Sequence, residues 1–300
     1  MPELPEVETI RRQLEPEVVG RRIESMRVLD PFWTQPVAST DVESAAEGRV
    51  IESVGRRGKY LLLGLDGGRW LVMHLRMTGN LVLSDHSERL GKPRLYEAPT
   101  DVRFLRVAIG LDDGRELLFT DARRFGTGVV VEDEELGDYL RGRAGIEPLS
   151  EALTTDALAE LASGRRVPLK SFLMVQSGVA GIGNIYADEA LHRAELHPLS
   201  PAGSMRREHI EALRAGIVAS LEAGLSNGGA SIDDYRDARG EAGSMQDEFL
   251  VHTREGRECG RCGATIRRIV VGGRSTYFCP GCQTRLRRRT KRRASGTAKR

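Results

Sequence analysis

Short stretches of alternating or continuous hydrophobic residues dominate the first half of the chain. They fall at residues 49–65, 70–83, 102–111 and 116–120. The interruptions carry the residues of tight turns, namely Gly67-Gly68 and Asp112-Asp113-Gly114. This pattern predicts a β-sandwich or barrel between about residues 20 and 136.

A helix is predicted ahead of these strands. Val7, Ile10 and Leu14 recur at helical spacing, and Pro5 suits a first helical position. The first residues of the chain would therefore be fixed to the start of a helix. The alternative is a frayed terminus that precedes a capped helix.

The period of the hydrophobic pattern changes beyond about residue 150. Apolar residues recur at three- and four-residue steps in residues 155–163, 169–176, 185–194 and 206–223, which predicts a helical domain. Residues 137–150 are the expected linker. Residues 225–245 form a long polar loop, and loops of this length are either disordered or functional lids.

All four cysteines lie near the end of the chain, with the spacing C-x2-C-x16-C-x2-C. They are Cys259, Cys262, Cys279 and Cys282. The spacing predicts a tetrahedral structural Zn²⁺ site, since four thiolates leave no open coordination position. Two short strands, at residues 265–271 and 275–278, would form a hairpin between the cysteine pairs, with Arg274 near its exposed tip. Strands, then helices, then this hairpin predict an α+β fold.

The charge is distributed unevenly. Residues 257–300 hold 14 basic residues and one acid, whereas the preceding residues hold 31 basic and 42 acidic ones. The residues after the hairpin, 285–300, are expected to be a disordered tail with non-specific affinity for nucleic acid. No apolar run is long enough to span a membrane and the start is acidic, so a cytosolic protein is expected.

The first residues carry candidate chemistry. Removal of Met1 would leave Pro2 with a free secondary amine beside the carboxylate of Glu3. An α-amine titrates near ~8, below a lysine at ~10.4, so part of it is unprotonated at neutral pH. After attack on an aldehyde carbon, a secondary amine gives an iminium with no N–H to lose, so the cation persists as an electron sink.

Three internal motifs are further candidates. Lys59 follows a Gly-Arg-Arg-Gly turn, and we expect the neighbouring cations to favour its deprotonation. Asn184 follows flexible glycines and is expected to be a helix N-cap, a position that also suits phosphate binding. Phe125 stands beside two arginines and is either buried packing or a wedge between bases.

Together these segments resemble the formamidopyrimidine-DNA glycosylase family from Met1 to about Gln283. The motifs are MPELPEVETI, GRRGKYLL, HLRMTGNL, DARRFGTG, GIGNIYADEALHRAELHP and the cysteine finger with GGRSTYFCPGC. The resemblance implies an N-terminal β-sandwich flanked by helices (residues 1–136), a helix-two-turn-helix domain (150–256), and a zinc finger (257–284). DNA would bind between the lobes.

The resemblance also implies catalytic roles. Pro2 would be the Schiff-base nucleophile and Glu3 the acid that assists opening of the sugar ring. Lys59 resembles the lysine of β-elimination, and Arg274 the finger arginine needed for δ-elimination. The activity implied is a bifunctional glycosylase and AP lyase that excises 8-oxoguanine and formamidopyrimidines from duplex DNA.

DNA-binding roles are implied in the same way. Asn184 and Arg165 would bind phosphate, and residues 225–245 would cover the damaged base. Three residues resemble the trio that fills the gap left by the everted nucleotide, namely Met77, Arg123 and Phe125. The expected partner is damaged double-stranded DNA, bound by a monomer in the bacterial cytoplasm at the nucleoid.

One departure and two alternatives remain. Where relatives often carry histidines, this chain has Ala98-Pro99-Thr100-Asp101, and Arg103 is the candidate replacement. Leu4 and residues 7–9 favour the purine-lesion branch over the endonuclease VIII branch, which prefers oxidised pyrimidines. A non-catalytic zinc-ribbon protein that binds nucleic acid would explain the cysteines and the tail, but not Pro2, Glu3 or Lys59.

Overall fold

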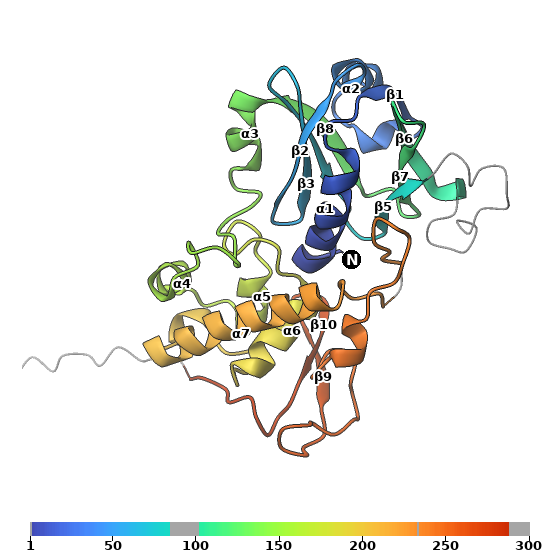
Figure 1. The fold of residues 1–300 in the computed structure, drawn as a ribbon. Helices are drawn as coiled ribbons and strands as arrows, with labels where there is room; N and C mark the ends of the chain where they lie inside the picture. The colour runs from blue at the N-terminus through green and yellow to red at the C-terminus, as the bar shows by residue number, and fades with distance from the viewer. Residues whose placement is uncertain (1, 85–101, 233, 288–300) are drawn as a thin grey trace, which may run out of the picture.

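The computed structural model describes residues 2–84, 102–232 and 234–287. The residues of the histidine departure, 98–101, lie outside this range, and so does most of the basic tail. Figure 1 shows a β-rich N-terminal lobe, a helical lobe, and a small hairpin that extends from the helical lobe. Helix α1 (Leu4–Val18) lies at the junction of the two lobes, where Leu4 N–H donates to Gly181 O at 3.0 Å.

Two four-stranded antiparallel sheets build the N-terminal lobe. The first has the order β1-β6-β7-β5 and the second β2-β3-β4-β8. The first sheet contains β1 (Ile23–Val28), β5 (Gly79–Ser84), β6 (Leu105–Leu111) and β7 (Glu116–Asp121). The second contains β2 (Ile51–Arg57), β3 (Tyr60–Leu65), β4 (Arg69–His74) and β8 (Thr127–Glu132). The strand expectations are confirmed, and of the two architectures considered the lobe is the sandwich.

The sandwich core explains the hydrophobic pattern of the sequence. Leu61 and Leu63 of one sheet pack in the same buried cluster as Ile109 and Phe119 of the other. Helix α1 contributes its apolar face to this cluster, and α2 (Ser39–Ala46) adds Val42 and Ala46. Helix α3 (Asp133–Leu140) packs instead on the outer face of the second sheet. The sheet is therefore buried on both faces, which is why β3 is apolar without alternation.

Four helices form the helical lobe around one core. They are α4 (Thr155–Ala162), α5 (Leu169–Leu173), α6 (Asn184–Arg193) and α7 (Arg207–Ser226). The predicted helix at 169–176 ends early, at Leu173. The Gln176 side chain accounts for this difference, because its amide donates to Ile182 O at 2.7 Å and its oxygen accepts from Gly181 N at 3.0 Å. Gln176 thus holds together the two turns between α5 and α6.

The finger is a two-stranded hairpin. It pairs β9 (Arg267–Val271) with β10 (Arg274–Phe278), and Gly272 and Gly273 form the turn at φ of 57° and 75°. These left-handed conformations suit glycine and explain the glycine pair in the sequence. Its small core, around Val251 and Ile266, is separate from those of the two lobes.

The long polar loop is pinned to the N-terminal lobe. Tyr235 and Ala238 are buried in the sandwich core. Leu83 N–H donates to Ala238 O at 2.9 Å, and Ala238 N–H donates to the Gln13 amide oxygen at 2.9 Å. Of the two interpretations of residues 225–245, the described part of the loop is therefore an ordered segment that connects the lobes.

Candidate functional site

The beginning of the chain is bound to the beginning of α6. The Glu3 carboxylate accepts hydrogen bonds from Gly183 N–H at 2.5 Å and from Ile185 N–H at 2.9 Å. Free N–H groups and the positive end of the helix dipole stabilise a carboxylate at this position. Pro2 and Glu3 are both buried, so these two residues are held in place.

Gly183 lets the acid and the lysine approach each other. A Cβ at this position would lie 2.4 Å from the Glu3 carboxyl carbon and 2.7 Å from Lys59 Nζ. Any side chain here would displace one of these two groups. The glycine in the sequence therefore serves a close approach as well as a turn.

Lys59 lies at the strand entry between β2 and β3 and is only 6% exposed. Burial lowers its pKa, and the Arg274 charge adds to this, whereas Glu3 and Glu6 oppose it. The expected lowering of the Lys59 pKa is confirmed, but the neighbouring arginines of the turn are not its cause. Arg56 and Arg57 are ion-paired to acids of their own, Glu8 and Glu147.

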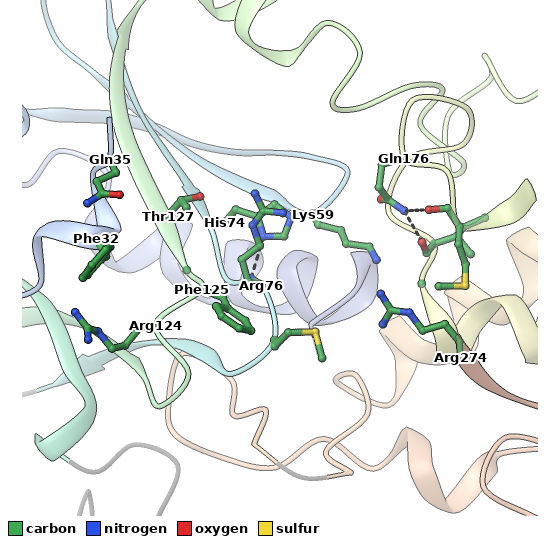
Figure 2. A pocket seen from close by; sticks show the side chains of 15 residues that line it. Phe32, Gln35, Lys59, His74, Arg76, Arg124, Phe125, Thr127, Gln176 and Arg274 are labelled. Carbon is green, nitrogen blue, oxygen red and sulfur yellow. Dashed lines mark hydrogen bonds between the residues drawn. The ribbon is translucent and has the colours of Figure 1, made fainter. Parts of the chain in front are cut away.

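Arg274 and Lys59 face each other across one end of a cleft of about 720 Å³. Figure 2 shows both side chains directed into this end, while Phe125 and Arg76 lie near the middle. Arg274 is exposed at the first residue of β10, as the sequence predicts for the hairpin tip. A buried amine, a carboxylate and a guanidinium thus meet beside the first residues of the chain.

Asn184 differs from expectation. It is the first helical residue of α6, and Gly183 is the N-cap. Its Oδ1 is buried and makes no hydrogen bond. The Glu3 carboxylate, far away in the sequence, instead accepts from the N–H groups of Gly183, Ile185 and Tyr186, so the expectation of an Asn184 cap is wrong.

Two turns of the sandwich project into the cleft and are tied to each other. Asp121 accepts from Phe125 N–H at 2.8 Å and from Arg123 N–H at 3.1 Å on one turn, and from the Thr78 hydroxyl on the other. Phe125 is 50% exposed, with the Arg123 guanidinium 4.8 Å from its ring centroid. Phe125 is therefore not buried packing, and Met77 lines the same cleft.

The four cysteines converge as the spacing predicts. The Sγ atoms of Cys259 and Cys282 are 3.8 Å apart, those of Cys262 and Cys279 are 3.4 Å apart, and all four lie within 4.8 Å of one another. A zinc tetrathiolate with Zn–S bonds of about 2.3 Å has sulfur pairs about 3.8 Å apart. The donor set fits one structural zinc, which would fix the hairpin that carries Arg274.

Comparison with known proteins agrees with this geometry. Three family models match: the formamidopyrimidine-DNA glycosylase N-terminal domain (residues 1–128), its H2TH domain (144–236), and a zinc finger found in FPG and IleRS (256–285). The formamidopyrimidine-DNA glycosylase of Chloroflexus aurantiacus is 44% identical over 285 residues, which cover 94% of this chain and 98% of the relative. The Roseiflexus protein of the same name is 43% identical over 286 residues, with 94% and 100% covered.

The chain belongs to the formamidopyrimidine-DNA glycosylase family.

Solved structures of family members share the fold. A Lactococcus lactis FPG mutant in complex with DNA that contains Fapy-dG has a TM-score of 0.85 at 34% identity, with 95% of this chain and 100% of that chain covered. MutM (FPG) from Thermus thermophilus has a TM-score of 0.81 at 40% identity, with 94% and 98% covered. Within the part of the chain that the structure describes, no helix is long and apolar enough to cross a membrane.

In this family member, Arg165 is not brought to the cleft. It is exposed after α4, its guanidinium Nε donates to Leu161 O at 3.1 Å, and it lines a different hollow with Ile146 and Glu160. Of the other predicted residues, Lys59, Met77, Phe125 and Arg274 line the cleft, and Glu3 and Asn184 line a second pocket that shares Met77 and Arg274 with it. Pro2 precedes Glu3, and Arg123 lies against the Phe125 ring. A phosphate contact by Arg165 would therefore lie at a distance from the lesion.

Several functional candidates were missed at the sequence level. Glu6 is fully buried, and burial, with the Glu3 charge, raises its pKa. It accepts from the Tyr186 hydroxyl at 2.7 Å and from Ala230 N–H at 2.8 Å, which joins α1, α6 and the long loop. His74 lines the cleft, and burial lowers its pKa to about 3. Both residues stand in quoted motifs, MPELPEVETI and HLRMTGNL, but nothing in the sequence shows that their side chains are buried at the cleft.

A second exposed aromatic was also missed. Phe32 lines the cleft and is 55% exposed, with the Arg124 guanidinium 4.6 Å from its ring centroid. Arg124 is in turn paired with Asp30. Phe32 lies far from the DARRFG motif along the chain, so only the fold brings them together.

Proposed function

We propose that this protein is a bifunctional DNA glycosylase and AP lyase of base excision repair. It excises oxidised purines, 8-oxoguanine and formamidopyrimidines, from duplex DNA and nicks the strand. The observation that carries the proposal is the meeting of Glu3, buried Lys59 and Arg274 beside Pro2 at one end of the cleft. Complexes of Lactococcus lactis FPG with Fapy-dG and abasic-site DNA support the substrate class.

Access to the base comes first. A base inside a duplex cannot be reached, so the damaged nucleotide must rotate out, at a cost of a few kcal/mol. Met77, Arg123 and Phe125 fill the space that it leaves and offset part of this cost. These three residues lie on two turns, and hydrogen bonds to the Asp121 carboxylate fix the two turns relative to each other before DNA binds.

Base removal follows at C1′. The Pro2 nitrogen lone pair forms a bond to C1′ as the glycosidic bond breaks, and the base leaves with that electron pair and takes up a proton. The bond leaves the Pro2 nitrogen with a proton, which the Glu3 carboxylate accepts and then donates to the ring oxygen. The C1′–O4′ bond opens as the nitrogen lone pair forms an iminium between Pro2 and C1′. The carboxylate is positioned for this step by the N–H groups of α6.

Strand scission uses the electron sink that the iminium provides. Lys59 in its neutral form takes a proton from C2′, and the electrons expel the 3′ phosphate in β-elimination. A second proton loss, from C4′, expels the 5′ phosphate in δ-elimination, and the Arg274 guanidinium binds the departing phosphate. The four cysteines would hold the zinc, which supplies the rigidity of the finger and no step of the chemistry.

A trapping experiment tests the proposal. The mature protein, incubated with a duplex containing 8-oxoguanine and with borohydride, should give a covalent protein–DNA adduct. Retention of Met1 or an N-terminal tag should abolish the adduct, because the proline nitrogen is then an amide, while a C-terminal tag should leave it intact. Absence of an adduct from the untagged protein would favour the nucleic-acid-binding alternative, and preferred excision of oxidised pyrimidines would favour the endonuclease VIII branch.

The protein is proposed to act as a monomer. One chain supplies every residue assigned here, so a monomer is sufficient. We place it in the bacterial cytoplasm at the nucleoid, where its substrate lies. Arg165 and Asn184 are proposed to bind phosphates, and residues 225–245 to cover the everted base, which is consistent with Ala230, Ile232 and Tyr235 lining a pocket with Glu3.

A further inference from the structure

The cleft contains two exposed aromatic residues, and the proposed mechanism uses only one of them. Phe125 is paired with Arg123, and Phe32 is paired in the same way with Arg124. Phe32 is 55% exposed, slightly more than Phe125. Aromatic rings stacked with arginine in an accessible cleft are surfaces on which nucleobases stack without regard to sequence.

Hydrogen bonds to one carboxylate hold the Phe32–Arg124 pair in place. Asp30 is 6% exposed, and its carboxylate accepts from Arg124 Nε at 2.6 Å and from Nη2 at 2.9 Å. The same carboxylate accepts from Phe32 N–H at 3.2 Å and so caps the short turn that carries the ring. Arg124 itself adopts a left-handed backbone conformation, with φ of 60°. One buried acid therefore fixes both members of the pair, and the guanidinium is restrained over the ring.

The position of the pair along the cleft identifies what it would contact. Lys59 and Arg274 occupy one end of the cleft, Phe125 lies between, and Phe32 and Gln35 occupy the other end (Figure 2). If Pro2 bonds to the damaged nucleotide, the lesion strand lies at the Lys59 end. The strand beyond Phe125 is then the complementary one.

We propose that Phe32, restrained by Arg124 and Asp30, stacks on a base of the complementary strand beside the gap left by the everted nucleotide. This inference rests on the proposed function. The wedge leaves that strand with a base that has lost its partner, and an exposed apolar face stabilises such a base. The guanidinium of Arg124 is held by two hydrogen bonds to Asp30 and faces the same strand.

The test measures how strongly Phe32 variants bind duplexes that differ by one missing base. Binding of the full-length mature protein is measured by fluorescence anisotropy on a duplex with a tetrahydrofuran abasic analogue in place of the lesion. Phe32→Ala should weaken binding about tenfold, as for loss of one stacking contact, and Phe32→Trp should restore it. Val19→Ala is the matched control, because Val19 is an exposed apolar residue at the end of α1, outside the residues that line the cleft.

The base is then removed in turn from the complementary nucleotide opposite the gap and from its two neighbours. At one of these positions the effect of Phe32→Ala should fall to less than about twofold, because the stacking partner is gone. An equal loss on every duplex or no loss at all would overturn the inference. Failure of the wild-type protein to form the borohydride adduct would instead overturn the proposed function.

Discussion

Lys59 is the residue whose chemistry depends most on its surroundings. Burial lowers its pKa, so more of the amine is neutral and able to accept a proton at physiological pH. The same burial has a cost. A basic group whose pKa is lower in the folded state than in the unfolded state lowers the free energy of unfolding. This destabilisation disappears only when the pH exceeds the pKa of the unfolded state.

Replacement of Lys59 should therefore separate activity from stability. Lys59→Met should reduce nicking at abasic sites about 100-fold, because the proton acceptor is lost. It should also raise the unfolding free energy by roughly 1 kcal/mol and the melting temperature by about 2 °C. Gel-based nicking assays and thermal melts at pH 7 measure the two effects.

The pH profile provides the control. Nicking by the wild-type protein should rise with pH and level off above the lowered pKa, since only the neutral amine accepts a proton. Lys59→Arg keeps the charge at every accessible pH, so a rise that remains in this variant belongs to the Pro2 amine, which titrates near ~8. A wild-type profile that is flat from pH 6 to 9 would contradict this role for Lys59.

At the scale of elements, the turns at the ends of the strands carry the three residues proposed to fill the gap in the duplex, here called the proposed wedge. The β4–β5 turn holds Met77 and the β7–β8 turn holds Arg123 and Phe125, and Asp121 joins them. Asp121 is 1% exposed and accepts four hydrogen bonds. An asparagine at this position has a single acceptor oxygen, so it cannot satisfy all of these donors.

Asp121→Asn should loosen both turns together. The cost in stability is about 2 kcal/mol, and excision of 8-oxoguanine from duplex DNA should fall roughly tenfold or more. Nicking of an abasic site in single-stranded DNA needs no wedge and should be unchanged. Asp138→Asn, at an exposed ion pair on α3, is the control. An equal loss on both substrates would show that Asp121 acts on the whole active site.

The elements themselves could largely be predicted from the sequence, because the hydrophobic period reports which face of a strand or helix is buried. Their ends and their partners could not. The helix that stops at Leu173 and the cap that Glu3 provides for α6 both depend on side chains that the fold brings in. The amine chemistry of Pro2 could be argued from the residues, and the roles of Glu3, Lys59 and Arg274 came from the family resemblance. The partners of Glu6 and the exposure of Phe32 needed the structure.

At the scale of the molecule, three separate hydrophobic cores each position a different part of the site. The sandwich positions Lys59 and the proposed wedge, the helical lobe positions Glu3, and the finger positions Arg274. The finger core is small, so the proposed zinc should supply most of its order. Loss of metal should therefore affect one part of the site selectively.

Chelation should stop δ-elimination without melting the sandwich. Loss of zinc disorders the hairpin and removes Arg274 from the cleft, whereas the cluster around Leu61 and Phe119 does not contain finger residues. Metal content, near-UV circular dichroism and cleavage are measured on the same sample. A δ-elimination product that persists after verified zinc loss would contradict this assignment, and zinc added back should restore that product.

The basic tail should affect affinity but not excision. The cut is best placed after Arg287, because Leu286 packs on the helical core and its N–H donates to Ser200 Oγ at 3.0 Å. Removal of residues 288–300 takes away seven basic residues, so binding to undamaged duplex should weaken and depend less steeply on salt. Single-turnover excision should stay within about twofold, and a larger drop would give the tail a role at the lesion.

The pinned loop has a consequence for how the molecule can be divided. Tyr235 and Ala238 follow the helical lobe in sequence, yet they complete the interior of the sandwich. A fragment that stopped at residue 136 would have an open socket where these two side chains belong, and the remaining fragment would expose them to water. The two halves of the polypeptide are therefore interdependent folding partners, although a break between them looks natural along the chain.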